Sequence, residues 1–276
     1  MPENVVDHPA VDVGVNGAVL EHPVLIETPG GVFGATITTP AGPPLAALVI
    51  LVGMSEDRSG ANAIWRVMAQ TAARLGVTVL RHDSAGVCDS HLSAEGDEGD
   101  DATLDVVRWF ACRTPDVPLL LLGYCKGAMS AVTVAMEDPA PLAVGLVSPP
   151  KKLFAPLPLR GVAKVRASVS SFRRGSASSR GPNSSVGPRD VDEAALFLDR
   201  TPTRAPTWML LGTDDRCVAE AQDLAMSKRH GDRLSVEVIE GVQVHWFTTP
   251  SIQEEVVTRV VAWMKRVLVA LPKGPP

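Results

Sequence analysis

Short apolar runs and stretches with helical spacing follow one another along most of the chain. Residues 32–39 alternate between apolar and polar like a strand, and residues 46–52 form a continuous apolar run typical of a buried strand. Apolar side chains recur every three or four positions from 61 to 75, which predicts a helix. Further strands are expected at 77–80, 118–122, 143–147, 208–211 and 234–239, and further helices at 103–112, from 126, at 219–230 and at 252–271. Strands alternating with helices predict an α/β fold with a mostly parallel, doubly wound sheet.

One long segment, residues 149–205, interrupts this alternation. Such a stretch inside a compact domain is typical of a lid or of a disordered loop. We therefore predict a core made of residues 1–148 and 206–276, with 149–205 as a basic, partly flexible lid or cap insertion. Within it, residues 151–189 hold nine of the 26 Lys and Arg residues and no Asp or Glu. This charge favours folding back over the acidic core or receiving an acidic partner or phosphates; a solvated loop is the alternative.

The composition excludes several classes of protein. The chain has 276 residues, 45% of them hydrophobic and 21% charged, and a net charge of −5, which argues against nucleic-acid binding. No apolar run is long enough for a membrane span, and the first residues do not resemble a secretion signal. Four cysteines, Cys88, Cys112, Cys125 and Cys217, lack metal-type spacing and are too few for a disulfide framework. We expect a cytoplasmic protein without a metal or cofactor.

The most informative motif is the sequence Gly-Tyr-Cys-Lys-Gly at positions 123–127. It lies between an expected strand and an expected helix, which is the layout of a nucleophile elbow. Cys125 stands at the centre, where Ser is usual. The positive end of a helix dipole favours the thiolate form of a cysteine. Cys125 is therefore the candidate nucleophile, and a buried structural thiol is the alternative.

Four segments together resemble the α/β-hydrolase family, and the resemblance extends over residues 20–270. They are the elbow at 123–127, the sequence Leu-Gly-Thr-Asp-Asp-Arg-Cys-Val at 211–218, the sequence Glu-Gly-Val-Gln-Val-His-Trp-Phe at 240–247, and the turn at 81–90, which is similar to D-x-R-G-x-G-x-S. The Cys elbow is similar to those of dienelactone hydrolases and polyhydroxyalkanoate synthases. The order nucleophile, acid, histidine is the one expected for this family. The resemblance implies an α/β-hydrolase fold.

The resemblance also implies roles for individual residues. His245 would deprotonate the Cys125 thiol and later activate water or an alcohol. Asp215 would orient His245, because its spacing from the neighbouring Gly and Val fits the family pattern; Asp214 remains an alternative. A Cys-His-Asp triad is therefore expected.

The resemblance further implies two backbone N–H donors for the developing oxyanion. One comes from the residue after the nucleophile, here Lys126. The other comes from the loop after an early strand, where Val52 and Gly53 replace the His-Gly of many relatives. Met54 is therefore the candidate second donor.

The turn at 81–90 departs from the family pattern at Ala85 and Cys88. Its acid, Asp83, is expected to tie down its own turn. We therefore assign no catalytic role to this turn.

A cysteine nucleophile favours particular substrates. The acyl-enzyme it forms is a thioester, so transfer from a thioester donor is nearly isoenergetic, whereas attack on an ordinary ester is uphill. We expect an acyl-transfer enzyme, a thioesterase-like hydrolase or acyltransferase, acting on a small acyl substrate, free or bound to coenzyme A or a carrier protein. The alternatives are a lyase that eliminates a carboxylate from an acylated substrate without a covalent intermediate, and a non-catalytic binding protein.

Overall fold

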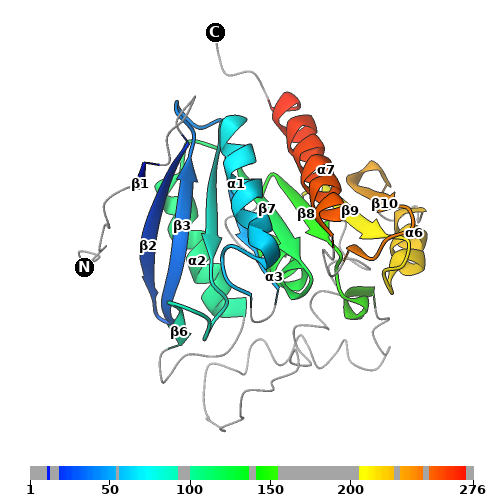
Figure 1. Ribbon diagram of the computed structural model, residues 1–276, viewed down its shortest axis with the longest axis horizontal. Coiled ribbons are helices and arrows are strands. Elements are labelled where there is room, and N and C mark those ends of the chain that lie inside the picture. Colours follow the sequence, from blue (N-terminus) through cyan, green and yellow to red (C-terminus); the bar gives the residue numbers. More distant parts are fainter. Residues whose placement is uncertain are drawn as a thin grey trace, which may run out of the picture.

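The structure of the protein is a computed structural model, which describes residues 11–12, 19–53, 56–92, 100–136, 141–154, 205–226, 231–244 and 249–271. Within these residues the chain forms one ten-stranded sheet with helices on both faces (Figure 1). The predicted doubly wound α/β sheet is confirmed.

Most of the sheet is parallel. Its strands are β1 (Val11–Asp12), β2 (Leu20–Thr28), β3 (Gly31–Thr39), β4 (Ala46–Leu51), β5 (Val77–His82), β6 (His91–Leu92), β7 (Leu119–Tyr124), β8 (Ala143–Val147), β9 (Thr207–Gly212) and β10 (Leu234–Ile239). They lie in the order β1-β2-β3-β5-β4-β7-β8-β9-β10, with β6 beside β3. The pairs from β5 to β10 are parallel, whereas β2 and β3 form an antiparallel hairpin and β3 pairs antiparallel with β5.

The helices divide between the two faces of the sheet. They are α1 (Ile64–Arg74), α2 (Asp100–Arg113), α3 (Lys126–Met136), α6 (Val218–Met226) and α7 (Pro250–Val269), with short 3-10 helices at Ala61–Ala63, Lys151–Phe154 and Gly231–Arg233. The buried side chains of α1 and α7 belong to one apolar cluster, and those of α2, α3 and α6 belong to the other. Figure 1 shows α1 and α7 in front of the sheet and α2 behind it.

The order of the strands reverses at β4. After β4 the chain crosses through α1 to β5 on one side, and β7 then pairs on the other side of β4. In sheets of this kind, ligands bind beyond the carboxyl ends of the strands where the order reverses. Leu51 at the end of β4 pairs with Gly123 near the end of β7. The predicted elbow therefore lies at the position where a binding site is expected.

Several elements differ from the sequence prediction. The two-residue strands β1 and β6 were not predicted, and α2 starts at Asp100 rather than at 103. Strand β2 was not predicted, because polar residues and a proline interrupt its alternation of apolar and polar positions. Its hydrogen-bonded pairing with β3 stabilises it as a strand. The helix predicted to start at 61 starts at Ile64, because Asn62 and Ala63 have left-handed backbone angles (φ 53° and 59°). Of the predicted insertion at 149–205, residues 151–154 form a 3-10 helix, and residues 155–204 lie outside the described part of the chain.

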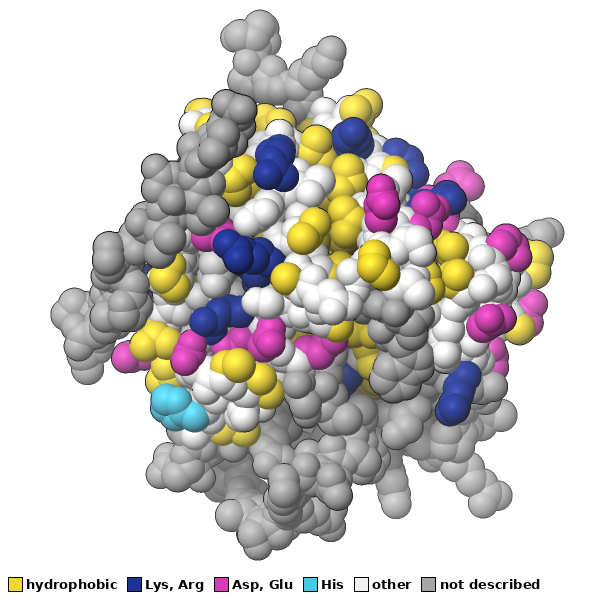
Figure 2. Space-filling view, in the orientation of Figure 1, with side chains coloured by type: hydrophobic (Ala, Val, Ile, Leu, Met, Phe, Trp, Pro, Cys, Tyr) yellow, Lys and Arg dark blue, Asp and Glu magenta, His cyan; other side chains and the backbone are white. Residues whose placement is uncertain are grey.

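The described surface carries charges of both signs. On the face shown in Figure 1, Figure 2 shows basic and acidic side chains next to one another and hydrophobic side chains in small groups. An ion pair between Arg66 on α1 and Glu21 on β2 (2.9 Å) contributes to this pattern. No helix in the described ranges is long and apolar enough to cross a membrane.

Candidate active site

The turn between β7 and α3 has the geometry of a nucleophile elbow. Strand β7 ends at Tyr124, α3 begins at Lys126, and Cys125 between them has a φ angle of 51°. A residue other than glycine rarely adopts this left-handed conformation, and such strain concentrates at functional sites. The turn is held because the Cys125 N–H donates to the Val147 carbonyl (3.1 Å) and the Cys125 carbonyl accepts from the Ala128 N–H (3.0 Å).

Both glycines of the motif are required, because other backbone atoms lie where a Cβ atom would be. A Cβ atom on Gly123 would lie 2.6 Å from the Cα atom of Ala128. A Cβ atom on Gly127 would lie 2.5 Å from the carbonyl carbon of Leu51, at the end of β4. The first turn of α3 therefore packs directly on the backbone of β4 and β7, which fixes Cys125 above the ends of these strands.

Replacing Gly127 with Ala should destabilise the protein, because backbone atoms of β4 would have to move to make room for the methyl group. Overpacking of this kind costs about 3 kcal/mol of unfolding free energy. Urea unfolding would measure this loss. Gly42→Ala is the matched control, since a Cβ atom there meets no atom within 4 Å. Equal unfolding midpoints for the two variants would contradict the close approach.

The thiol of Cys125 is partly buried, and its surroundings act on its acidity in opposite directions. Burial has the largest effect and raises the pKa of the Cys125 thiol. A hydrogen bond from the Lys126 backbone N–H lowers the pKa, and the charge of Glu56 raises it. The net direction is upward, so burial outweighs the helix N-terminus that was expected to favour the thiolate. Burial therefore opposes formation of the thiolate at Cys125.

The structure adds Glu56, which the sequence analysis did not single out. It follows β4, and its Oε2 atom accepts a hydrogen bond from the Gly53 N–H (3.0 Å). Burial raises the pKa of the Glu56 carboxyl, and its contacts with Gly53 and the nearby Trp65 side chain lower it. The charge of Glu56 also acts on the Cys125 thiol, so we include this carboxylate in the candidate site. The only sequence signal was its position in the loop predicted to supply an oxyanion donor.

Asp215 lies in the turn after β9 and is held in one orientation. Its Oδ2 atom accepts from the Gly212 N–H (2.9 Å), and its own N–H donates to the Gly212 carbonyl (3.0 Å). Two residues after Asp215, the thiol of Cys217 donates a hydrogen bond to the Pro149 carbonyl (3.1 Å). Asp215 is only 7% exposed, whereas Asp214 is exposed. Burial and fixed orientation favour Asp215 over Asp214 as an orienting acid.

The chain leading to His245 packs against the turn that holds Asp215. A Cβ atom on Gly212 would lie 2.9 Å from the Val244 nitrogen, and Val244 is fully buried. The residue directly before His245 therefore lies against the end of β9. His245 and the candidate oxyanion donor Met54 themselves lie outside the described residues, so their roles remain predictions.

Three of the candidate groups act together on Tyr124, which precedes the nucleophile. Burial raises the pKa of the Tyr124 hydroxyl, and the charges of Glu56, Cys125 and Asp215 raise it further. The Tyr124 ring also lies 5.2 Å from the Trp65 ring between centroids. Charges from the ends of three different strands, β4, β7 and β9, therefore act on one tyrosine. In the described part of the chain, no three His, Cys, Asp or Glu side chains are grouped as metal ligands.

Comparison with solved structures shows the fold. A thermostable carboxyl esterase from Bacillus coagulans superimposes with a TM-score of 0.61 at 12% identity, over 90% of this chain and 99% of its own. An α/β serine hydrolase without a lid from Xanthomonas campestris gives 0.59 at 15% identity, over 92% and 97%. Proline iminopeptidase from Mycobacterium smegmatis gives 0.59 at 16% identity, over 90% and 99%. No family model matches the sequence, and no curated protein matches it.

Proposed function

Because this chain has the α/β-hydrolase fold, as the solved structures show, we propose that it is an acyl-transfer enzyme with Cys125 as its nucleophile. It is a thioesterase-like hydrolase or an acyltransferase. The observation that carries the proposal is the left-handed Cys125 at the end of β7, between two glycines that no larger residue can replace without backbone movement. This arrangement presents a thiol at the crevice of the sheet, where a substrate carbonyl can reach it.

The proposed reaction has two covalent steps. His245 takes the proton of the Cys125 thiol, and the thiolate attacks the acyl carbonyl carbon. The backbone N–H groups of Lys126 and Met54 hold the oxyanion, and Asp215 orients His245. Collapse of this tetrahedral intermediate breaks the bond to the leaving group, which receives the proton from His245. Water or an acceptor alcohol then gives a proton to His245, attacks the acyl-enzyme and releases the product, and the Cys125 sulfur regains its proton.

The cysteine selects thioesters or activated esters as substrates in this proposal. Exchange of one thioester for another requires little free energy, whereas an ordinary ester must expel a poorer leaving group. The nine basic residues between 151 and 189 would receive an acidic carrier protein or the phosphates of a coenzyme A ester. A thiol nucleophile also requires a reducing compartment, so we propose the cytoplasm as its location.

One observation favours a lyase as the second candidate function. Burial and the charge of Glu56 raise the pKa of the Cys125 thiol, which opposes formation of the attacking thiolate. In a lyase, His245 and the oxyanion donors would promote loss of a carboxylate from an acylated substrate without a covalent bond to Cys125. The two candidates differ in whether an acyl-enzyme forms.

Intact-protein mass spectrometry separates the two candidates. After rapid mixing with a short-chain acyl thioester and acid quenching, we expect a mass increase of one acyl group on the wild-type protein. Peptide mapping should place the adduct on Cys125. The exposed thiol of Cys112 is the internal control, because it should stay unmodified under the same conditions. Turnover without any adduct at short times would favour the lyase.

A further inference from the structure

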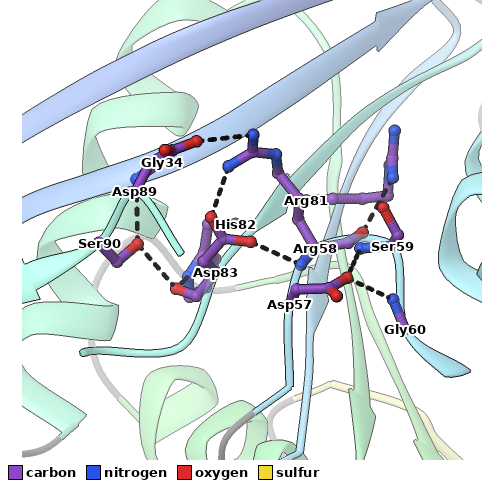
Figure 3. A network of polar contacts seen from close by, with 10 residues as sticks. All are labelled: Gly34, Asp57, Arg58, Ser59, Gly60, Arg81, His82, Asp83, Asp89 and Ser90. Atoms are coloured by element: carbon purple, nitrogen blue, oxygen red, sulfur yellow. Dashed lines mark hydrogen bonds and ion pairs between the residues drawn. The ribbon is translucent and has the colours of Figure 1, made fainter. Parts of the chain in front are cut away.

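Two loops at the edge of the site are fastened together by a polar network (Figure 3). We call residues 53–60, which follow β4, the β4 loop, and residues 83–90, which follow β5, the β5 turn. The β4 loop contains Glu56 and the candidate donor Met54. The β5 turn is the segment that resembles D-x-R-G-x-G-x-S, and the proposed reaction gives it no role.

Ser84 bonds the β4 loop at two places. Its hydroxyl donates to the Gly53 carbonyl (2.8 Å), and its backbone N–H donates to the Glu56 carbonyl (3.2 Å). Gly53 lies against Tyr124, since a Cβ atom on it would lie 3.5 Å from a carbon of the Tyr124 ring, and the charge of Glu56 acts on the Cys125 thiol. A single serine of the β5 turn therefore bonds both of these residues of the β4 loop.

Arg58 provides the second attachment. Its backbone N–H donates to Asp83 Oδ1 (2.7 Å), and its guanidinium pairs with Asp83 and with Asp89 (2.9 Å). The Arg58 carbonyl accepts a hydrogen bond from Arg81 (2.9 Å), so that β5 also contacts the β4 loop. Figure 3 shows these side chains converging between the two segments.

The buried charge of Asp83 requires its pairing with Arg58. The Asp83 side chain is 0% exposed and Arg58 only 24%, and a buried carboxylate left without its cation is strongly unfavourable. The family pattern places an Arg two positions after this acid, where this chain has Ala85. Here the cation comes from the β4 loop instead. Pairing of the buried acid therefore requires the β4 loop to stay in position.

We propose that Arg58, Asp83 and Ser84 are positioning residues that hold the β4 loop, with Gly53 and Glu56, in place beside Cys125. Their effect on turnover rests on the proposed acyl transfer, whereas their effect on the loop and on the thiol does not. If the loop moves, the Glu56 carboxylate moves away from the sulfur and the oxyanion donors separate. A displacement of about 1 Å in such a site can cost up to roughly 100-fold in rate.

Ser84→Ala is the test variant, because it removes one hydroxyl from a partly buried position without leaving a buried charge unpaired. Ser90→Ala is its matched control. Ser90 lies in the same turn and is more buried, but its hydroxyl contacts the Gly34 N–H (3.0 Å) and the Asp83 carbonyl (3.3 Å) rather than the β4 loop. Both substitutions remove the same atom from the same turn, and only one loosens the β4 loop.

Three readouts are compared in wild type and both variants. Amide hydrogen exchange should become faster across 53–60 in Ser84→Ala only. The rate of Cys125 alkylation by iodoacetamide is measured by peptide mass at a series of pH values. The midpoint of this pH profile should shift to lower pH in Ser84→Ala, because the negative charge of Glu56 that raises the pKa of the thiol is displaced. Glu56→Gln sets the reference for this shift. With a thioester substrate, kcat should fall about tenfold in Ser84→Ala with KM nearly unchanged.

Substitutions of Arg58 provide an independent test of the proposal. Arg58→Ala should show a larger shift in the alkylation profile than Ser84→Ala, and Arg58→Lys should restore part of it because the cation beside Asp83 is kept. Unchanged exchange and alkylation in Ser84→Ala, or equal effects in Ser84→Ala and Ser90→Ala, would overturn the proposal. A wild-type protein that transfers no acyl group would overturn the proposed function alone, since exchange and alkylation still decide whether these residues position the loop.

Discussion

Replacing Cys125 with Ala should lower kcat/KM for an acyl thioester by about 10⁴-fold or more, because the proposed covalent intermediate forms on its sulfur. The fold should survive, since Ala removes one sulfur atom from a partly buried position and adds nothing. Steady-state kinetics on purified protein, with the unfolding midpoint measured in parallel, would separate the loss of chemistry from a loss of structure.

The control variants use an exposed thiol elsewhere and the side chain that is usual at this position. Cys112→Ala changes an exposed cysteine on α2, away from the elbow, and should leave kcat/KM within about twofold. Cys125→Ser keeps a nucleophile in the same left-handed turn. Its turnover of esters should recover more than its turnover of thioesters, because the acyl-enzyme that it forms is an ordinary ester. Near wild-type turnover by Cys125→Ala would exclude covalent catalysis and support the lyase.

Much of the fold could be predicted from the sequence because its strands are buried on both faces. Strand β4 and the greater part of β7 and β9, residues 119–122 and 208–211, are continuous apolar runs, every residue of which is buried, and such runs are read directly from the sequence. Strand β2 could not be read in this way, because only one face of it is apolar and its pattern contains Pro23 and Glu21. Its place depends on pairing with β3, which is a tertiary interaction.

The same distinction explains which site residues could be predicted. Cys125 and Lys126 stand in a five-residue motif whose geometry is local, and the turn around Asp215 is equally compact. Arg58 had no local signal, because the acid it pairs with is 25 residues away in the sequence. The contact of Ser84 with Gly53 spans 31 residues. The attachment of the two loops is therefore visible only when β4 and β5 lie side by side.

The identity of the orienting acid gives the second large prediction. Asp215→Asn should lower kcat by about 10³-fold to 10⁴-fold, because in the proposed reaction the Asp215 carboxylate stabilises the imidazolium that forms when His245 takes the thiol proton, and an amide would not. The amide oxygen can still accept the Gly212 N–H, so the turn after β9 should keep its shape. The measurement is kcat with a thioester substrate, with the unfolding midpoint as a check on structure.

Asp214→Asn is the matched control for this prediction. It makes the same exchange of one carboxylate oxygen for an amide NH2 in the neighbouring residue of the turn, but Asp214 is exposed and its backbone N–H, rather than its carboxylate, contacts Val242 (3.1 Å). An exposed carboxylate is screened by water and orients a neighbour weakly, so kcat should change less than about threefold. A large loss in Asp214→Asn with none in Asp215→Asn would make Asp214 the acid. Equal, small losses would mean that His245 acts without an orienting carboxylate, which is feasible for a thiol because its sulfur is a strong nucleophile once deprotonated.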